Sequence, residues 1–337
     1  MSAMKISYQE YPLLFKVPFH LSNGVRNHTD SIIVKLQREG ITAFGELSLP
    51  PYLPYTLTSS KKELDQFISN PCFDVTELKS HSFSAPVNHA LTTLLLDFQC
   101  KKNNLSIYDH LNIPFLNQAT SCFTLSVQSI DQLPKAIQSI QDYPLIKFKV
   151  NNENVVEYLN VLVKHWNKPF YLDTNQGWNE STPIQEIAQI LNDSGCQMIE
   201  QPFSVDQLQL NDRMRNITNI PIIADESFQS VTDIPLVAQH FDGVNIKLMK
   251  CGGILNALEI IHALNESHLK VMIGCMTSSS CNLSVASALL HYADFIDLDA
   301  IDLIKNDGFQ GFNFKNGVIN NSKNVSFGFI PDKAKLS

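Results

Sequence analysis

The hydrophobic pattern of the chain changes character at about residue 120. From there, short apolar runs alternate with amphipathic segments, the pattern of βα units around a parallel sheet. Since a reactive or polar residue ends nearly every run, we expect a (β/α)8-type barrel rather than an open doubly wound sheet. The expected strands are Thr124–Val127, Leu145–Val150, Phe170–Asp173, Met198–Glu200, Ile222–Asp225, Gly243–Lys247, Val271–Gly274 and Phe295–Asp297.

The residues before this point follow a different pattern, that of antiparallel strands followed by helices. Ser31–Leu36 and Thr42–Leu47 alternate in polarity around Arg38-Glu39-Gly40, which predicts a hairpin. Apolar residues at helical spacing then predict helices near 59–69 and 85–101. We therefore expect an N-terminal α+β domain over 1–117, the barrel over 118–310, and a C-terminal segment over 311–337 that packs back on the N-terminal domain.

Two stretches of the N-terminal domain are typical of loops that set specificity. The polar stretch 22–28 contains Arg26, and the proline-rich stretch 50–55 contains Tyr52 and Tyr55.

Composition narrows the class of protein. The net charge of −8 and the pI near 5.7 argue against nucleic-acid binding. No apolar segment approaches the roughly 18 residues of a membrane span. The seven cysteines form no C-x-x-C pair, and the first residues lack the pattern of a signal peptide. We expect a cytoplasmic protein with no nucleic-acid or membrane partner.

The strand Leu145–Val150 carries two lysines, Lys147 and Lys149. Because side chains alternate along a strand, both lysines lie on one face and Phe148 lies on the other. Taken alone, such a pair indicates an exposed edge strand. The residues that end the later strands favour a different interpretation.

Three acids end successive strands: Asp173, Glu200 and Asp225. Any one of them could cap the helix that follows. In a barrel, however, these strand ends converge, and three carboxylates together require a compensating cation. All-oxygen ligands suit a hard divalent ion, so the three acids predict a Mg2+ site.

The strand Gly243–Lys247 places Asn245 and Lys247 on one face, across a barrel from Lys149. A neighbouring cation lowers the pKa of a lysine, so Lys147 is expected to tune Lys149 as a base. Two lysines on opposite sides of a chelated carboxylate can remove an α-proton from one face and return it to the other. The metal would stabilise the enediolate formed in between.

The motifs K-F-K, L-D-T-N-Q-G-W, I-E-Q-P, I-A-D-E-S and N-I-K together resemble the muconate-lactonizing branch of the enolase superfamily. The resemblance covers almost the whole chain. It implies an α/β fold, a (β/α)7β TIM-like barrel with an N-terminal α+β capping domain, with Lys149 and Lys247 as acid/base pair. It also implies Mg2+ bound by the three acids, surrounded by Asn175, Asn245 and Glu226.

The last two strands resemble the dipeptide epimerases of this branch. Their I-G-C-M and D-x-D motifs match Cys275, Met276 and Thr277 and the pair Asp297 and Asp299. The resemblance implies that the two acids hold a substrate ammonium, as paired carboxylates would. The alternative is that they cap the following loop or pair with a lysine.

Two departures from that pattern bear on specificity. Ala300 follows the D-x-D, where a glycine is usual, and Gly24 stands where an arginine pairs with the substrate's glutamate. Arg26 could substitute for that arginine, whereas Tyr52 and Tyr55 would equally favour an apolar dipeptide.

The resulting hypothesis is an isomerase, a Mg2+-dependent epimerase of Ala-Glu-like or related dipeptides. It would invert the α-carbon of the C-terminal residue, in murein peptide metabolism, and could form a homo-oligomer. The rivals within the branch are an o-succinylbenzoate synthase, an N-succinylamino acid racemase and a cycloisomerase. A more distant rival is a barrel that binds metal without catalysis.

Overall fold

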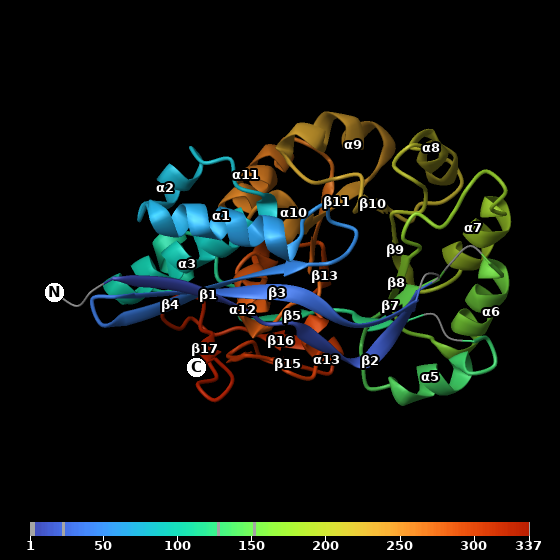
Figure 1. The fold of residues 1–337 in the computed structure, drawn as a ribbon. Coiled ribbons are helices and arrows are strands. Elements are labelled where there is room, and N and C mark those ends of the chain that lie inside the picture. Colours follow the sequence, from blue (N-terminus) through green and yellow to red (C-terminus); the bar gives the residue numbers. More distant parts are fainter. Residues whose placement is uncertain (1–3, 22–23, 127–128, 151–152, 337) are drawn as a thin grey trace.

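A computed structural model describes residues 4–21, 24–126, 129–150 and 153–336. Its centre is a sheet of parallel strands that neighbour one another in sequence order (Figure 1). The edges approach each other, since the amide of Cys122 donates to the carbonyl of Ile296 at 3.1 Å. The strands are β6 (Phe123–Leu125), β7 (Ile146–Lys149), β8 (Phe170–Asp173), β9 (Cys196–Glu200), β10 (Ile222–Ala224), β11 (Gly243–Lys247), β12 (Lys270–Gly274) and β13 (Phe295–Asp297).

Helical segments connect each strand to the next and surround the sheet (Figure 1). This arrangement confirms the expected TIM-like barrel with its capping domain. The end of the first expected strand, Val127, lies outside the described residues. The helices are α5 (Leu133–Ser139), α6 (Val155–His165), α7 (Ile184–Asn192), α8 (Gln209–Arg215), α9 (Ile234–His240), α10 (Leu248–Cys251), α11 (Ile254–Leu264), α12 (Ser280–Ser287) and α13 (Ala300–Leu303).

The N-terminal sheet is built on one long strand, β3 (Gly24–Arg38), which pairs with β1 (Lys5–Glu10), β2 (Leu13–Leu21) and β4 (Ile41–Leu49). The turn between β3 and β4 has positive φ at Glu39 and Gly40, as a two-residue hairpin turn requires. The expectation of a loop over 22–28 is wrong for residues 24–28, because β3 begins at Gly24 and pairs with β2. Residues 22 and 23 lie outside the described residues.

Helices α1 (Leu57–Ser69), α2 (Val75–Leu78), α3 (Ala85–Asn103) and α4 (Ile107–Leu111) complete this region. Helix α3 packs so closely on β4 that a Cβ added at Gly45 would lie 2.0 Å from the Ala90 carbonyl oxygen. Two barrel residues, Met249 and Met276, belong to the hydrophobic cluster of this capping region. The cap and the barrel therefore share a core.

The C-terminal residues contact both regions. Strand β16 (Val318–Asn320) pairs with β5 (Gln118–Thr120), and Ser326 bonds to the backbone of Leu105 and to the side chain of Asp97 on α3. Short strands β14 (Phe309–Gln310), β15 (Phe314–Lys315) and β17 (Ile330–Pro331) complete the segment.

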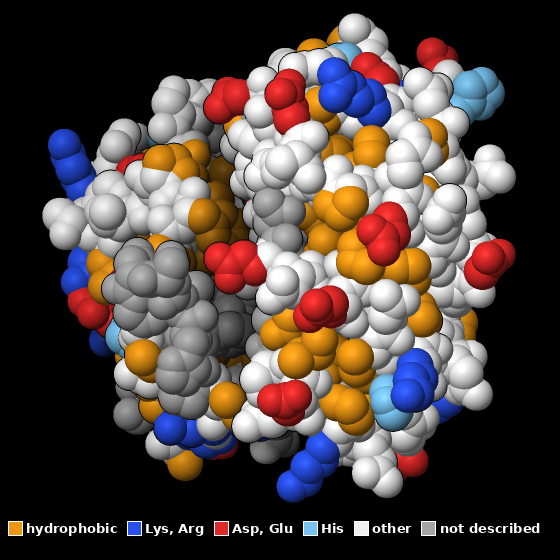
Figure 2. Space-filling view, turned by 90° about the vertical axis from the view of Figure 1, so that its right-hand side faces the viewer, with side chains coloured by type: hydrophobic (Ala, Val, Ile, Leu, Met, Phe, Trp, Pro, Cys, Tyr) orange, Lys and Arg blue, Asp and Glu red, His pale blue; other side chains and the backbone are white. Residues whose placement is uncertain are grey.

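No helix among the described residues has both the length and the apolar character to span a membrane. Seen from the side of α6 and α7, the surface is hollowed along a groove with hydrophobic side chains inside it (Figure 2).

Candidate active site

The strand register aligns the predicted site residues at the carboxyl ends of the barrel strands. Lys149 pairs in register with Asp173, and Asp173 pairs with Glu200. On the other side of the barrel, Lys247 pairs with Gly274, and Gly274 pairs with Asp297. The shared register brings both lysines and the acids to one end of the barrel, as the strand-end pattern predicted.

Gly274 makes room for an amide that holds the central carboxylate. A Cβ at Gly274 would lie 2.4 Å from Oδ1 of Asn245. Asn245 is fully buried, and its Nδ2 donates to Glu200 Oε1 at 2.7 Å. Glu200 is itself fully buried, so burial and the charge of Asp173 raise its pKa. Among the described atoms, Asn245 Oδ1 has no hydrogen-bond partner.

Asp173 receives two ammonium groups. Lys149 Nζ lies 3.1 Å from Oδ2 and Lys147 Nζ lies 3.5 Å from it. Lys149, whose side chain is 32% exposed, also donates to Asn175 Oδ1 at 2.9 Å. Burial alone would raise the pKa of Asp173, but the two lysines lower it. The carboxylate is therefore held ionised in a buried position.

Asp225 also receives two ammonium groups, one of which the sequence did not predict. Lys247 Nζ lies 2.7 Å from Oδ2. Lys250 Nζ lies 2.7 Å from Oδ1 and 2.6 Å from the carbonyl oxygen of Asp225. Burial alone would raise the pKa of Asp225, but these two lysines lower it. In the sequence, Lys250 could have been noticed as a lysine among apolar residues, three positions after Lys247.

The pKa of Lys247 is set by the balance between burial and the neighbouring carboxylates. Burial lowers its pKa, but the charges of Asp225 and Glu200 outweigh burial and raise it well above 10.5. Lys147 behaves in the same way because of Asp297, Glu200 and Asp173. The expectation that Lys147 tunes Lys149 as a base stays a prediction.

The D-x-D pair divides between two partners. Asp297 forms an ion pair with Lys147 and accepts a bond from the Cys122 thiol at 3.2 Å. Asp299 accepts the backbone N–H of Thr124 at 2.6 Å and, within the described part of the chain, forms no ion pair. Burial and the charge of Asp297 raise the pKa of Asp299 to about 7. The alternative interpretation of the two acids is that they pair with a lysine. Only Asp297 does so.

The charge balance of this centre suits a divalent cation. When all groups are ionised, six carboxylates face four ammonium groups, so two negative charges remain uncompensated. Glu226 is one of the six, with an unpartnered Oε2 and a pKa raised to about 7 by burial and by Asp225. Buried carboxylate oxygens are the donors that Mg2+ prefers. The carboxylates are Asp173, Glu200, Asp225, Glu226, Asp297 and Asp299, and the ammonium groups are Lys147, Lys149, Lys247 and Lys250.

The carboxylates are not already gathered around one point. Across residues 4–336, wherever they are described, no three acidic, thiol or imidazole groups form a ready metal-binding cluster. Lys147 Nζ lies within 3.5 Å of both Asp173 and Glu200 and so stands between them. Bringing the three acids onto one cation would require the lysines to move aside.

Gln201 is a second residue that sequence reasoning missed. Its Oε1 accepts the amides of Asp225 at 2.9 Å and Ser227 at 3.1 Å, and its Nε2 donates to Phe203 and Ser227. Its φ of 37° is in the left-handed region, where a non-glycine residue is strained. The buried amide thus fixes the end of β10 against the end of β9.

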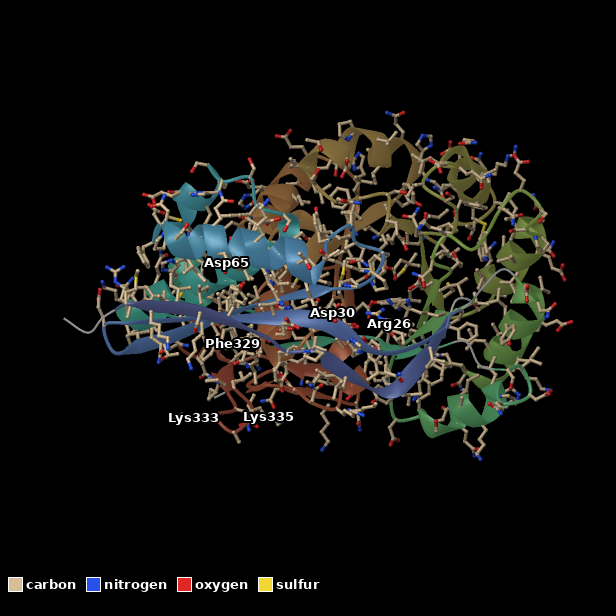
Figure 3. The ribbon with its side chains drawn as sticks, in the orientation of Figure 1. Arg26, Asp30, Asp65, Phe329, Lys333 and Lys335 are labelled. Atoms are coloured by element: carbon tan, nitrogen blue, oxygen red, sulfur yellow. The ribbon has the colours of Figure 1, made fainter. Side chains whose placement is uncertain are left out.

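Arg26 is tied to its own strand. Its Nε donates to the His28 carbonyl at 3.1 Å, its Nη2 donates to Thr29, and its guanidinium lies 5.2 Å from the Phe15 ring centre. Burial lowers its pKa. Figure 3 shows Arg26 on β3 near Asp30, where the cap lies in front of the barrel.

The other predicted binding residues lie between cap and barrel. The Tyr52 hydroxyl donates to Met276 Sδ at 3.1 Å, and the buried Met276 packs into the cap cluster. Cys275 donates its backbone N–H to Asp297 at 3.0 Å, and Thr277 is half-buried in the same loop. Tyr55 packs against the cap cluster.

Comparisons with known proteins give a consistent picture. Residues 132–330 match the profile of the family described as enolase C-terminal domain-like. The L-Ala-D/L-amino acid epimerase of Flavobacterium johnsoniae is 30% identical over 328 residues, covering 95% of this chain and 97% of the relative. The L-Ala-D/L-Glu epimerase of Bacteroides thetaiotaomicron is 31% identical, covering 94% and 85%.

Among solved structures, one similar fold is that of a dipeptide epimerase from Cytophaga hutchinsonii, complexed with Mg and the dipeptide D-Ala-L-Val. It superposes with a TM-score of 0.87 at 23% identity, covering 97% of this chain and 95% of that one. At this identity the likeness supports the fold alone.

Proposed function

The chain belongs to the enolase C-terminal domain-like family, and on this premise we propose that it is a Mg2+-dependent epimerase of dipeptides. The two relatives at 30% and 31% identity carry epimerase names and match over nearly the whole chain. The observation that carries the proposal is the placement of Lys149 and Lys247, which approach the buried Asp173–Glu200–Asp225 set from different strands. The reaction class is that of an isomerase acting on amino acid derivatives.

The metal would be held by Asp173, Glu200 and Asp225, whose buried oxygens fit a hard cation. When bound, it would stabilise the negative charge that develops on a substrate carboxylate as the α-proton leaves. Carboxylates engaged in this way would act less strongly on the lysines, so the pKa of Lys247 would fall from its present raised value.

The proton transfer itself is assigned to the two lysines. One lysine, as the free amine, accepts the α-proton, and the other, as the ammonium, donates a proton to the opposite face of the same carbon. The charge of the pair is unchanged after each turnover, while the α-carbon is inverted. Lys147, bound to Asp297 and Glu200, would hold these two carboxylates in place.

The substrate ammonium is assigned chiefly to Asp299. Asp297 already pairs with Lys147, whereas Asp299 has no ion pair among the described residues. A cation beside Asp299 would return its pKa from about 7 toward its ordinary value, so binding would release a proton near neutral pH. A substrate without an ammonium group would lack this interaction.

We propose that the enzyme accepts dipeptides that differ in their second residue. Two of the donors of Arg26 are bound to its own strand, and its guanidinium lies over Phe15. Arg26 would then shape the entrance rather than pair with an acidic side chain. We place the enzyme in the cytoplasm, in accord with its seven unbridged cysteines.

The test is proton exchange in D2O with Mg2+, using a library of L-Ala dipeptides alongside N-succinyl amino acids. Deuterium should enter the α-carbon of the C-terminal residue of several dipeptides. The Lys61→Met variant, altered at an exposed lysine of α1, serves as control. Deuterium in the N-succinyl compounds alone would favour a racemase of the same family, and no exchange in any compound would refute the proposal.

A further inference from the structure

A buried carboxylate of the cap lies at the start of a barrel helix, outside the centre described above. Glu46, in β4, is fully buried. Its Oε1 accepts the backbone N–H of Ser279 at 3.1 Å, and its Oε2 accepts the Ser279 hydroxyl. Ser279 is the N-cap of α12, and only Ser278 separates it from the loop of Cys275, Met276 and Thr277.

The cap holds Glu46 in a fixed place. The neighbouring Gly45 lies against α3 with no room for a side chain, so the backbone of β4 packs directly on that helix. Successive side chains of a strand point to opposite faces, which directs Glu46 away from α3 and toward α12. Both ends of the contact are therefore anchored on rigid elements.

In the part of the chain that the structure describes, the contact contains no cation. Within the described residues, Glu46 forms no ion pair, and its oxygens accept N–H and O–H groups at the positive end of the α12 dipole. Asp307 caps the next residue in the same way, accepting the N–H of Ser280 at 3.2 Å. Two carboxylates from outside the barrel strands thus hold the first residues of α12.

The loop before α12 touches the cap a second time at Met276, which accepts the Tyr52 hydroxyl and packs into the cap cluster. At its other end the loop joins the site, because Cys275 donates to the carbonyl of Asp297. Movement of Ser279 would therefore be passed to residues that line the site. Figure 1 shows the cap strands lying across the region of α12.

We propose that Glu46 is a positioning residue that fixes the loop Cys275–Ser279 through Ser279 and thereby sets the affinity of the site for its substrate. The effect on affinity rests on the proposed function, whereas the effect on the loop does not. Hydrogen bonds to a buried charge are worth enough that losing this one should raise KM about tenfold. Turnover at saturation should change little, since Glu46 touches no reacting group.

The test compares Glu46→Gln with Glu39→Gln, a control at the exposed turn of the same hairpin. Because burial raises the pKa of Glu46 to about 7, the measurements are made at about pH 8, where it is ionised. Amide hydrogen exchange should accelerate in peptides covering residues 275–283 of Glu46→Gln alone. In dipeptide turnover, KM should rise while kcat stays within about twofold of the parent.

Unchanged exchange over residues 275–283, acceleration spread over the whole chain, or a fall in kcat at constant KM would each overturn the proposal. If the parent protein turns over no dipeptide, the exchange measurement alone decides, and the failure belongs to the proposed function. If Glu46→Gln does not fold, Ser279→Ala removes the hydroxyl donor from the other side. It should accelerate the same peptides, and unchanged exchange there would contradict the proposal.

Discussion

Two regions of this molecule bury carboxylates, and they compensate the charge in different ways. At the strand ends, Asp173 and Asp225 each lie against two lysines, and the balance still leaves negative charge over. At the contact of cap and barrel, Glu46 has no lysine among the described residues and is bound by the N-terminus of α12. One region compensates charge with the ammonium groups of lysine side chains, and the other with the N-terminus of a helix.

This difference suggests that the strand-end centre carries out the chemistry, whereas the Glu46 contact positions other residues. A long lysine side chain can exchange protons and change partners, so the strand-end centre suits proton transfer. Backbone N–H groups at a helix end hold their place, so the Glu46 contact suits a static joint. If this distinction is correct, substitutions in the two regions should change different measured quantities.

The largest effect is expected at the two lysines. Lys149→Met and Lys247→Met each remove one of the two proton-transferring groups, so epimerisation should fall by at least about 10³-fold. The measurement is the rate of interconversion of the two epimers by chiral chromatography. Lys164→Met, in the last turn of α6, is the matched control and should keep parental activity. Activity within tenfold of the parent in either site variant would be incompatible with the assignment.

Lys250→Met should lower the unfolding free energy by about 4 kcal/mol, because it leaves a buried carboxylate with one cation fewer. Lys79→Met breaks an exposed pair with Glu259 and should cost less than about 1 kcal/mol. Urea denaturation of both variants measures the two losses. Equal losses would show that Lys250 does not compensate Asp225.

The Glu46 carboxylate should make stability depend on pH between about 4.5 and 7. Its pKa is about 7 in the folded protein, chiefly because of burial, and 4.5 in the reference state. Within this window the folded protein binds a proton that the unfolded chain has released. Raising the pH should therefore lower the unfolding free energy by about 3 kcal/mol, and the loss is complete above pH 7.

Glu46→Gln should remove that slope. The titratable groups nearest to Glu46 are Asp307, Tyr11 and Cys281, and they remain in the variant. Urea denaturation of parent and variant from pH 5 to pH 8 isolates the difference. Parallel curves for the two proteins would show that Glu46 does not titrate in this range.

The smallest effect is expected at Arg26, in the cap. Since two of its donors are bound to β3, Arg26→Ala should change kcat/KM for L-Ala-L-Glu relative to L-Ala-L-Leu by less than about fivefold, under 1 kcal/mol. The two substrates are compared in one exchange assay. A loss above a hundredfold confined to L-Ala-L-Glu would make Arg26 the partner of an acidic side chain.

The sequence predicted the barrel and the strand-end set because both depend on local pattern. Alternation places Lys147 and Lys149 on one face, and each acid stands at the end of an apolar run, so their convergence follows from the fold. The bounds of β8, β11 and β13 match the expected ranges. The roles of the site residues and the domain boundaries stay predictions.

The contacts that escaped sequence reasoning join residues far apart in the chain. Glu46 and Ser279 are 233 residues apart, and no sequence pattern near Glu46 indicates that Ser279 is its partner. Arg26 was expected in a loop because its surroundings are polar, but pairing with β2 makes it part of β3. The direction of the Lys247 pKa also depends on distances that only the folded structure provides.

The central claim is that Lys149 and Lys247 act on opposite faces of one α-carbon. It is tested most directly by α-proton exchange of each pure epimer in D2O, with the two lysine variants assayed separately. We expect each variant to exchange the proton of one epimer only, with Lys149→Met and Lys247→Met sparing different epimers. A variant that still exchanged both epimers at the parental rate would contradict the two-base account.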